Sequence, residues 1–186
     1  MNRDSLDAGR LIAVVGPSGV GKDSVIDGML AADTRLRRVR RVVTREAGLP
    51  GEDHIPMDAE AFGEAVSAGA FCLHWHAHGL SYGIPLHVLR DVAAGEHCVV
   101  NLSRDAVRDA VARFPAVIAL HVTARPETIA ARLAQRGRES LDQIRHRLAR
   151  SNRPLPDSVD VVHIANDGSL DDAVAAALRA LQPVSA

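Results

Sequence analysis

The most informative stretch of the chain runs from Gly16 to Ser24 and reads GPSGVGKDS. It fits the phosphate-binding pattern Gly-x-x-x-x-Gly-Lys-Ser/Thr except at the last position, where Asp23 stands in place of the hydroxyl that holds magnesium. The apolar run RLIAVV before it is typical of a buried strand, and a helix is expected from Lys22 to about Ala31. In this context the N–H groups of the loop and of the helix N-terminus point at phosphate oxygens. The nucleotide-binding residues predicted from the motif are Gly16, Pro17, Ser18, Gly19, Val20, Gly21, Lys22, Asp23 and Ser24.

Two charged side chains define the chemistry of this loop. Lys22 supplies a point charge for the β- and γ-phosphates, and we predict that it is catalytic. A carboxylate beside a triphosphate is repulsive unless a cation lies between them, and Mg2+ accepts carboxylate oxygen readily. Asp23 is therefore the predicted metal ligand, and ATP and Mg2+ are the predicted cofactors. Asn101 ends a later strand, at a position where many kinases with a phosphate loop carry an acidic magnesium partner. Because Asn101 has no charge, the carboxylate of Asp23 is more necessary for holding the ion.

Length, charge and composition exclude several other classes of protein. A chain of 186 residues fits one domain, and a net charge of −1 argues against a general nucleic-acid coat. No apolar run approaches the ~20 residues of a membrane span, and the first ten residues lack the apolar core of a signal peptide. Cys72 and Cys98 have neither metal-site spacing nor the pattern of a disulfide framework. We therefore expect a cytoplasmic protein with reduced thiols, a small-molecule substrate, and no nucleic-acid or membrane partner, whose oligomeric state is unknown.

Strand and helix patterns alternate along the chain. Apolar runs are typical of strands at 37–44, 70–75, 97–102, 116–123 and 159–164, whereas 45–56 and 76–83 are typical of a loop and a turn. Helices are expected from Asp58 to Gly69, from Pro85 to Gly95, from Ser103, from Pro126 to Gly137, from Ser140 and from Ser169. This alternation predicts the α/β class, with a mostly parallel sheet covered by helices on both faces.

The basic side chains are almost all arginine and are unevenly spread. Of the 22 lysines and arginines only Lys22 is a lysine; six arginines lie between 35 and 45, and seven lie between 132 and 153. A GTPase is excluded, because the sequence has no Asp-x-x-Gly and its sole lysine leaves no Asn-Lys-x-Asp guanine reader. A small-molecule kinase is better supported, since it needs an acceptor site and a basic lid that excludes water during transfer.

The order of several segments resembles the guanylate kinases over nearly the whole chain. These segments are GPSGVGK, TREAGLPGE, Trp75 with HGLSYG, and LAQRGRES with IRHRLAR. Two features of the sequence depart from the pattern of that family. His74 stands where a glutamate helps to read guanine, and Gly48 and Leu49 lie where the TRxxRxGE loop has its second arginine.

A closer resemblance is to the ribose 1,5-bisphosphate phosphokinases of phosphonate breakdown, which look like guanylate kinases. The shared features are the loop ending GKDS, Thr44-Arg45 with His54, WHAHGLSYG from Trp75, RGRE from Arg136, and NDGS from Asn166. The resemblance implies a single guanylate kinase-like P-loop domain with a core at about 9–35, 96–124 and 155–186, an acceptor-binding insertion at about 36–95 and an arginine-rich lid at about 125–154. The activity it implies is ATP-dependent phosphorylation of the 1-phosphate of ribose 1,5-bisphosphate, which gives 5-phosphoribosyl 1-diphosphate.

Such an acceptor has two phosphates and no base, so its site needs cations and hydroxyl groups rather than a purine slot. We predict Arg41, Arg45, His78 and Tyr82 as substrate-binding residues; the alternative is an exposed basic strand with a structural tyrosine. The neighbouring arginines at 37, 38 and 40 are interpreted as surface charge, and Trp75 is interpreted as core. The alternating histidines at 74, 76 and 78 could share one face of a strand, but no cysteine or carboxylate joins them, and a metal site is not predicted there.

Two further groups complete the predicted site. Arg136, Arg138 and Arg147 are predicted to clamp the transferred phosphoryl group from the lid and are grouped with Lys22 as catalytic; the alternative is a solvated basic helix pair or an RNA patch. Asn166 and Asp167 follow the last strand and are predicted to border the adenine, against the alternative of a loop and helix cap.

Two other functions compete with the sugar-phosphate kinase. One is a nucleoside monophosphate kinase, in particular a guanylate kinase. The other is a non-catalytic guanylate kinase-like module that binds protein ligands. The intact Lys22, the three loop glycines and the arginine-rich lid argue against such a module.

Overall fold

The computed structural model describes residues 9–45, 53–135 and 154–182. Its centre is a five-stranded sheet in the order β2-β7-β1-β8-β9, and every pair of neighbouring strands in it is parallel. We call it the main sheet. Its strands are β1 (Arg10–Val15), β2 (Leu36–Arg38), β7 (His97–Asn101), β8 (Val117–Thr123) and β9 (Asp160–Ala165). The predicted α/β class with a parallel sheet is confirmed.

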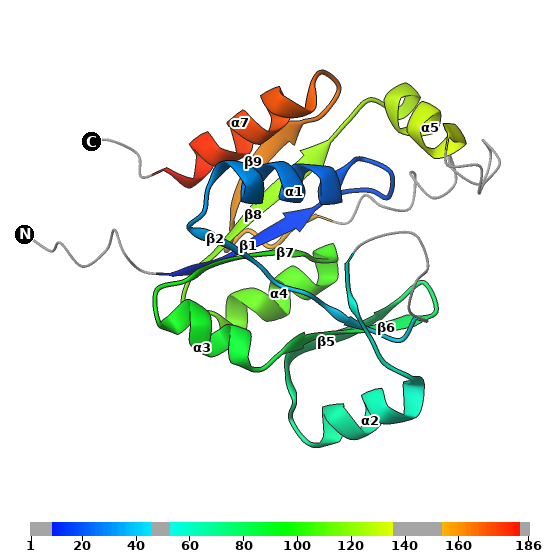
Figure 1. Ribbon diagram of the computed structural model, residues 1–186, viewed down its shortest axis with the longest axis vertical. Coiled ribbons are helices and arrows are strands. Elements are labelled where there is room, and N and C mark those ends of the chain that lie inside the picture. The colour runs from blue at the N-terminus through cyan, green and yellow to red at the C-terminus, as the bar shows by residue number, and fades with distance from the viewer. Residues whose placement is uncertain (1–8, 46–52, 136–153, 183–186) are drawn as a thin grey trace, which may run out of the picture.

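Helices cover both faces of the main sheet. Successive side chains of each strand point to opposite faces, so the apolar strands present side chains for burial on both sides. Ile12 and Val14 of β1 join one buried cluster, while Leu11, Ala13 and Val15 join another. Figure 1 shows α1 and α7 over one face and α3 and α4 over the other. The helices are α1 (Lys22–Ala32), α3 (His87–Ala93), α4 (Arg104–Arg113), α5 (Pro126–Gln135) and α7 (Leu170–Leu181).

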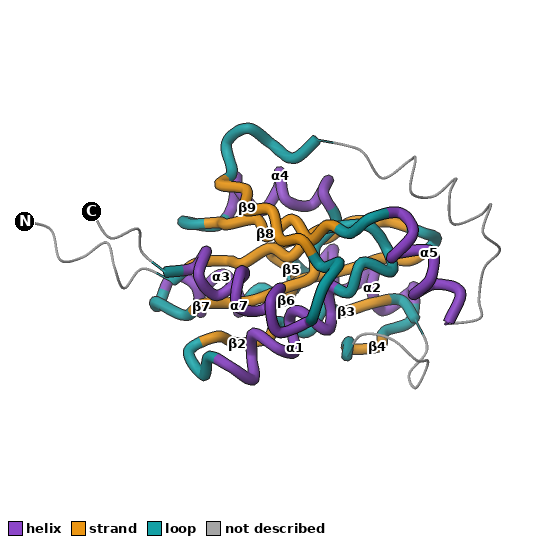
Figure 2. Tube along the Cα trace, turned by 90° about the horizontal axis from the view of Figure 1, so that it is seen from above, coloured by secondary structure: helices purple, strands orange, loops and turns teal. Residues whose placement is uncertain are grey.

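A second, smaller sheet is inserted between α1 and α3 together with helix α2 (Ala59–Ser67). We call it the small sheet, and its order is β4-β3-β6-β5. Its strands are β3 (Val42–Val43), β4 (Ile55–Pro56), β5 (Phe71–Ala77) and β6 (Leu80–Pro85). Phe62 of α2 stacks on Phe71 of β5 with ring centroids 4.9 Å apart, and α4 packs against β5 from the main body. Figure 2 shows β3 and β4 at the same end of the molecule as α5, away from both termini.

The predicted helix caps are confirmed where the structure describes them. The side chain of Asp58 accepts a hydrogen bond from the backbone N–H of Ala61 at 2.8 Å, and Ser103 accepts one from Ala106 at 3.1 Å. Ser169 begins α7 in the same way. The helix expected from Ser140 lies outside the described residues. The division of the chain into core, acceptor and lid segments stays a prediction.

Four predictions of local structure are wrong. The run 37–44 is not one strand, because it leaves the main sheet after β2 and enters the small sheet at β3. The segment expected to be a loop contains β4. The stretch 76–83 is not a turn throughout: only His78 and Gly79, with φ of 53° and 74°, connect β5 to β6, and α3 begins at His87 rather than Pro85. Two consecutive residues with positive φ match the right-handed twist of a hairpin, and a histidine at the first of them gives a weak sequence signal.

Cys72 and Cys98 are free and buried, and burial raises the pKa of each thiol to about 11. Both are therefore protonated and unreactive near neutral pH, as the composition predicts. No helix in the described part of the chain is long and apolar enough to cross a membrane.

Candidate nucleotide and acceptor site

The phosphate loop, which we define as Gly16 to Ser24, connects β1 to α1 at the carboxyl edge of the main sheet. Gly19 and Gly21 have φ of 84° and 96°, which glycine adopts without steric cost. A Cβ atom on Gly16 would lie 2.4 Å from the carbonyl oxygen of Val122. The loop therefore requires glycine for its conformation and for its close packing against β8.

Lys22 is held over the loop by the loop's own carbonyl groups. Its Nζ donates hydrogen bonds to the carbonyl oxygens of Gly16 at 2.9 Å and Pro17 at 3.1 Å. Val20, by contrast, has a fully buried side chain that belongs to the core cluster beneath α1. The only lysine of the chain thus lies against the backbone of the loop, and an apolar side chain anchors the loop in the core.

Asp23 and Asn101 are brought together although they are far apart in the sequence. β7 pairs with β1 so that Asn101 lies opposite Val14, and its Nδ2 donates a hydrogen bond to Asp23 Oδ1 at 3.1 Å. The two side chains present hard oxygen atoms of the kind that Mg2+ prefers. Ser24 is exposed on the helix. Among the described residues no three histidines, cysteines or carboxylates form a metal cluster.

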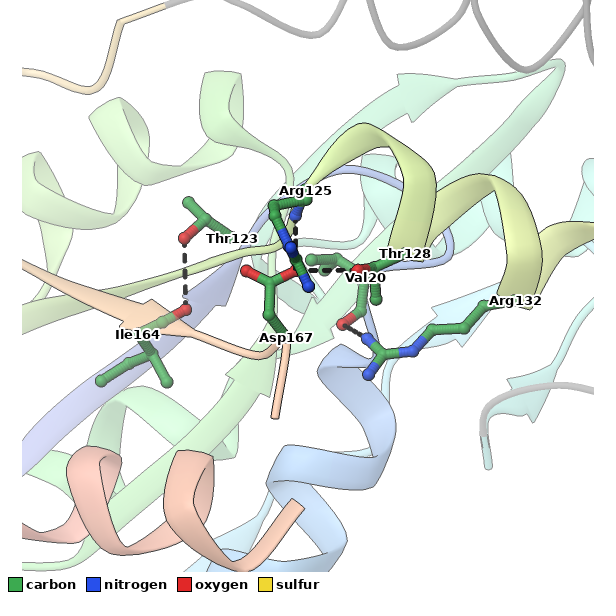
Figure 3. Close-up of polar contacts among 7 residues, drawn as sticks. All are labelled: Val20, Thr123, Arg125, Thr128, Arg132, Ile164 and Asp167. Atoms are coloured by element: carbon green, nitrogen blue, oxygen red, sulfur yellow. Dashed lines mark hydrogen bonds and ion pairs between the residues drawn. The ribbon is translucent and has the colours of Figure 1, made fainter. Parts of the chain in front are cut away.

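Asn166 and Asp167 lie beside the phosphate loop, but their side chains bind protein groups. Asn166 is only 3% exposed, and its Nδ2 donates to the carbonyl oxygen of Val20 at 2.8 Å. Asp167 Oδ1 accepts from the backbone N–H of Arg125 at 2.7 Å and from Thr128 Oγ1 at 2.9 Å, at the start of α5 (Figure 3). The Arg125 N–H is the main cause that lowers the pKa of Asp167. Their role toward adenine stays a prediction.

Helix α5 touches the loop directly, through residues that the sequence did not single out. Arg132 Nη1 donates to the carbonyl oxygen of Val20 at 3.2 Å, as Figure 3 shows. A Cβ atom on Gly19 would lie 2.7 Å from Cγ of Leu133, so this side chain packs closely on the loop. The only signal for Arg132 is its place at the start of the second arginine-rich stretch. The arginines predicted to clamp the phosphoryl group, Arg136, Arg138 and Arg147, lie outside the described residues.

On the small sheet, two of the predicted acceptor ligands, Arg41 and Tyr82, come together with Trp75. Trp75 and Tyr82 lie opposite each other on β5 and β6, and their rings stack with centroids 5.3 Å apart and an interplanar angle of 9°. The guanidinium carbon of Arg41 lies 4.8 Å from the centroid of Tyr82 and 5.8 Å from that of Trp75. Trp75 is partly buried at the edge of the core, so the interpretation of it as a core residue is incomplete.

Strand alternation separates this cluster from the neighbouring histidines. Trp75 packs against the core cluster that contains the main sheet, whereas His74 and His76 are exposed. His78 is exposed at the tip of the β5–β6 hairpin. His78 therefore lies at the hairpin tip, and its role in binding the substrate stays a prediction.

Arg45 follows a segment that is hydrogen-bonded to the same hairpin. The backbone N–H of Thr44 donates to the carbonyl oxygen of Ser81 at 3.0 Å, and the N–H of Ser81 donates to Thr44 Oγ1 at 2.8 Å. The N–H of Arg45 donates to the carbonyl oxygen of Val43 at 2.8 Å. These bonds fix the backbone at Thr44 and Arg45 next to Ser81 of the hairpin.

The other arginines of the first basic stretch pair with carboxylates. Arg37 bonds Glu96, Arg38 bonds Asp27, and Arg40 bonds Asp53. Their interpretation as surface charge is confirmed. The guanidinium group of Arg41 lies over two aromatic rings.

A family model described as guanylate kinase matches residues 8–183 of the chain. The ribose 1,5-bisphosphate phosphokinase PhnN of Ruegeria sp. (strain TM1040) is 48% identical over 177 residues, which are 94% of this chain and 92% of that protein. The enzyme of the same name from Agrobacterium fabrum is 39% identical over 92% of this chain and 96% of its own. The chain belongs to the ribose 1,5-bisphosphate phosphokinase family. Members of this family are kinases with the guanylate kinase-like P-loop fold, and both predictions are confirmed.

A solved structure supports the fold of the family member described here. Guanylate kinase from Anaplasma phagocytophilum superposes with a TM-score of 0.72 and 18% sequence identity, covering 94% of this chain and 85% of that one. At this identity the likeness concerns the fold alone.

Proposed function

We propose that the protein transfers the γ-phosphoryl group of ATP, in the presence of Mg2+, to the 1-phosphate of ribose 1,5-bisphosphate. The products are ADP and 5-phosphoribosyl 1-diphosphate. The observation that carries this proposal is the position of the Arg41 guanidinium over the rings of Tyr82 and Trp75, two residues of the small sheet. A cation there suits an anionic sugar phosphate. The relatives named above are called ribose 1,5-bisphosphate phosphokinases, which agrees.

On the nucleotide side, the proposed roles follow from the loop geometry. The loop N–H groups and Lys22 bind the β- and γ-phosphates, and the ammonium charge stabilises the charge that develops on them. Asp23 would hold Mg2+, with Asn101 Nδ2 fixing one of its oxygens, and the ion when bound would neutralise phosphate charge. We propose that Asn166 and Asp167 border the adenine through surfaces left open by their contacts with the protein.

On the acceptor side, the nucleophile is an oxygen of the 1-phosphate. Its bond to the γ-phosphorus forms as the bond from that phosphorus to the bridging oxygen breaks, and ADP leaves with the electron pair. A phosphate monoester has its second pKa near 6, so the oxygen is already ionised near neutral pH and no strong general base is needed. Arg41, Arg45 and the hydroxyl of Tyr82 would bind the acceptor phosphates, with His78 at the rim. The protein then has to align the acceptor phosphate with the γ-phosphate and to neutralise the charge of both.

The arginine-rich segment supplies the remaining cations in this proposal. Arg136, Arg138 and Arg147 would clamp the transferred phosphoryl group, and their segment follows directly after α5, whose Arg132 and Leu133 contact the phosphate loop. An arginine that stabilises the charge of this transition state contributes strongly to turnover in other phosphoryl-transfer enzymes.

Guanylate kinase activity is the second candidate, and one feature argues against it. His74, at the position where guanylate kinases carry a base-reading glutamate, is exposed and does not belong to the Arg41–Tyr82–Trp75 cluster. Guanine would therefore lack the carboxylate that reads its base in guanylate kinases. A non-catalytic module would have no need for a phosphate loop with three glycines and a lysine.

The proposal is tested by measuring ADP release from MgATP with ribose 1,5-bisphosphate, with GMP, and with no acceptor. The product is identified by 31P NMR as a sugar 1-diphosphate. We expect rapid turnover with the bisphosphate and very slow turnover with GMP. Preference for GMP would establish the guanylate kinase, and no turnover with either acceptor would support the binding module.

A further inference from the structure

The carbonyl oxygen of Val20 accepts two hydrogen bonds from side chains of two other elements. Asn166, just after β9, donates through Nδ2 at 2.8 Å, and Arg132 of α5 donates through Nη1 at 3.2 Å. Figure 3 shows Arg132 reaching the loop from α5. Backbone groups of a phosphate loop are expected to bind the nucleotide. The Val20 carbonyl is instead bound by two side chains of the protein itself, so these two hydrogen bonds require an explanation.

The orientation of this carbonyl determines the orientation of a neighbouring N–H group. A trans peptide is planar, so its C=O and N–H point in opposite directions. The Val20 carbonyl and the Gly21 N–H belong to the same peptide unit. When the Val20 carbonyl points toward Asn166 and Arg132, the Gly21 N–H points to the opposite side of the peptide. If the peptide flipped, the carbonyl oxygen, which is the negative end of the peptide dipole, would lie on that side instead.

Glycine at position 21 makes such a flip easy in the absence of other constraints. Gly21 has φ of 96°, and glycine populates positive and negative φ about equally. A residue with a Cβ could not rigidify the loop here, because that atom would lie 2.6 Å from Asn166 Nδ2. The loop must therefore be held in place by groups outside it.

We propose that Asn166 and Arg132 are positioning residues of the phosphate loop, which fix the Val20–Gly21 peptide so that the Gly21 N–H is available to the β-phosphate of the nucleotide. Asn166 is the fixed member of the pair, since it is buried and its own N–H donates to the carbonyl of Thr123 at 2.8 Å. Arg132 is the member carried by α5. Asp167 bonds the start of that helix and so sets the place from which Arg132 reaches the loop.

The test is calorimetric titration of the whole protein with ADP and ATP, and competition of AMP against a fluorescent ADP, in the absence of any acceptor. ADP and ATP have a β-phosphate and AMP has none. We expect Asn166→Ala to weaken ADP and ATP binding about 2- to 13-fold, the range for one lost hydrogen bond to a neutral donor, and Arg132→Ala to weaken it about 13- to 160-fold, the range for a charged donor. AMP binding should change less than about 2-fold in Arg132→Ala, because the peptide faces the β-phosphate. In Asn166→Ala, whose side chain is also proposed to border the adenine, AMP binding should fall by a clearly smaller factor than ADP binding. Arg132→Lys should lie between Arg132→Ala and the parent.

Two variants complete the experiment. Asn166→Asp keeps the size of the side chain but places a carboxylate against the Val20 carbonyl, so its ADP affinity should fall further than that of Asn166→Ala. Arg108→Ala, on the exposed side of α4, is the matched arginine control and should leave all three affinities unchanged. Equal losses for AMP and ADP would overturn the proposal in favour of an adenine contact or a general structural role. Unchanged ADP affinity in Arg132→Ala, which keeps the buried Asn166, would also overturn it. Because no acceptor is present, these outcomes do not depend on the proposed reaction.

Discussion

The phosphate loop and the small sheet form their binding groups in different ways. The loop uses backbone N–H groups, is shaped by glycines and is enclosed by β8, β9 and α5. The small sheet uses the side chains of Arg41, Tyr82 and Trp75 on strands that have a small hydrophobic cluster of their own. A backbone site suits any nucleoside triphosphate, whereas side chains can change from one acceptor to another without a new fold. We therefore propose that acceptor specificity resides in the small sheet.

The largest expected effect is that of Lys22→Ala. We expect turnover to fall at least roughly 10³-fold, because the ammonium group stabilises charge that develops on the transferred phosphoryl group. The melting temperature without nucleotide should stay close to that of the parent, since Lys22 is only partly buried and belongs to none of the buried hydrophobic clusters. Substantial remaining turnover would show that this loop does not catalyse phosphoryl transfer.

Substitutions of Asp23 should have the next largest effect. Asp23→Asn should lower turnover about 10- to 100-fold and weaken its magnesium dependence, the usual range for a residue that supports a metal site. ATP without metal should bind no worse than to the parent, because a repulsive charge has been removed. Asp23→Ser should recover more activity than Asp23→Ala. The measurements are a magnesium titration of turnover and the affinity for metal-free ATP; if Asp23→Ala matches the parent in both, the carboxylate has no metal role.

Two arginines of the first basic stretch give a matched pair for the acceptor end. Arg45→Ala should raise the KM for ribose 1,5-bisphosphate about 10- to 50-fold, since a charged hydrogen bond to phosphate is lost. Arg40→Ala removes an exposed ion pair with Asp53 and should leave that KM unchanged. The KM for ATP should stay constant in both variants. Equal effects of the two substitutions on the acceptor KM would mean that this stretch acts only through its overall charge.

The smallest expected effect is that of Trp75→Leu, which removes the ring beside Tyr82 and Arg41. The acceptor KM should rise about 2- to 10-fold, the range for one lost ring pair and one weakened cation–π contact. Steady-state kinetics with both substrates would measure it. A change confined to the KM for ATP would place this cluster on the nucleotide side instead.

The main sheet could be predicted from the sequence because its signals are local. The run RLIAVV is followed directly by glycines and Lys22, and the caps Asp58, Ser103 and Ser169 lie where hydroxyl or carboxylate side chains precede helical patterns. The small sheet could not be predicted so well. Its strands β3 and β4 have two residues each, and its hairpin turns at His78 and Gly79 without the usual asparagine or aspartate signal.

The site shows the same contrast between local and distant relations. The nine loop residues form one segment of sequence, so their pattern identifies them. The contact of Asn101 with Asp23, and those of Asn166 and Arg132 with Val20, join residues more than 70 positions apart. Only strand order and helix packing bring such pairs together, and neither is encoded in a local motif. The stack of Arg41 on Tyr82 and Trp75 likewise depends on the register of β5 and β6.

The decisive measurement is a competition in one tube between ribose 1,5-bisphosphate and GMP at equal concentration, with limiting MgATP and products resolved by 31P NMR. The product ratio gives the ratio of kcat/KM for the two acceptors. If cations on the small sheet read the acceptor, almost all of the transferred phosphate appears in the sugar 1-diphosphate. If GDP is the main product, the small sheet reads a base, and the assignment of acceptor specificity to Arg41, Arg45 and Tyr82 is wrong.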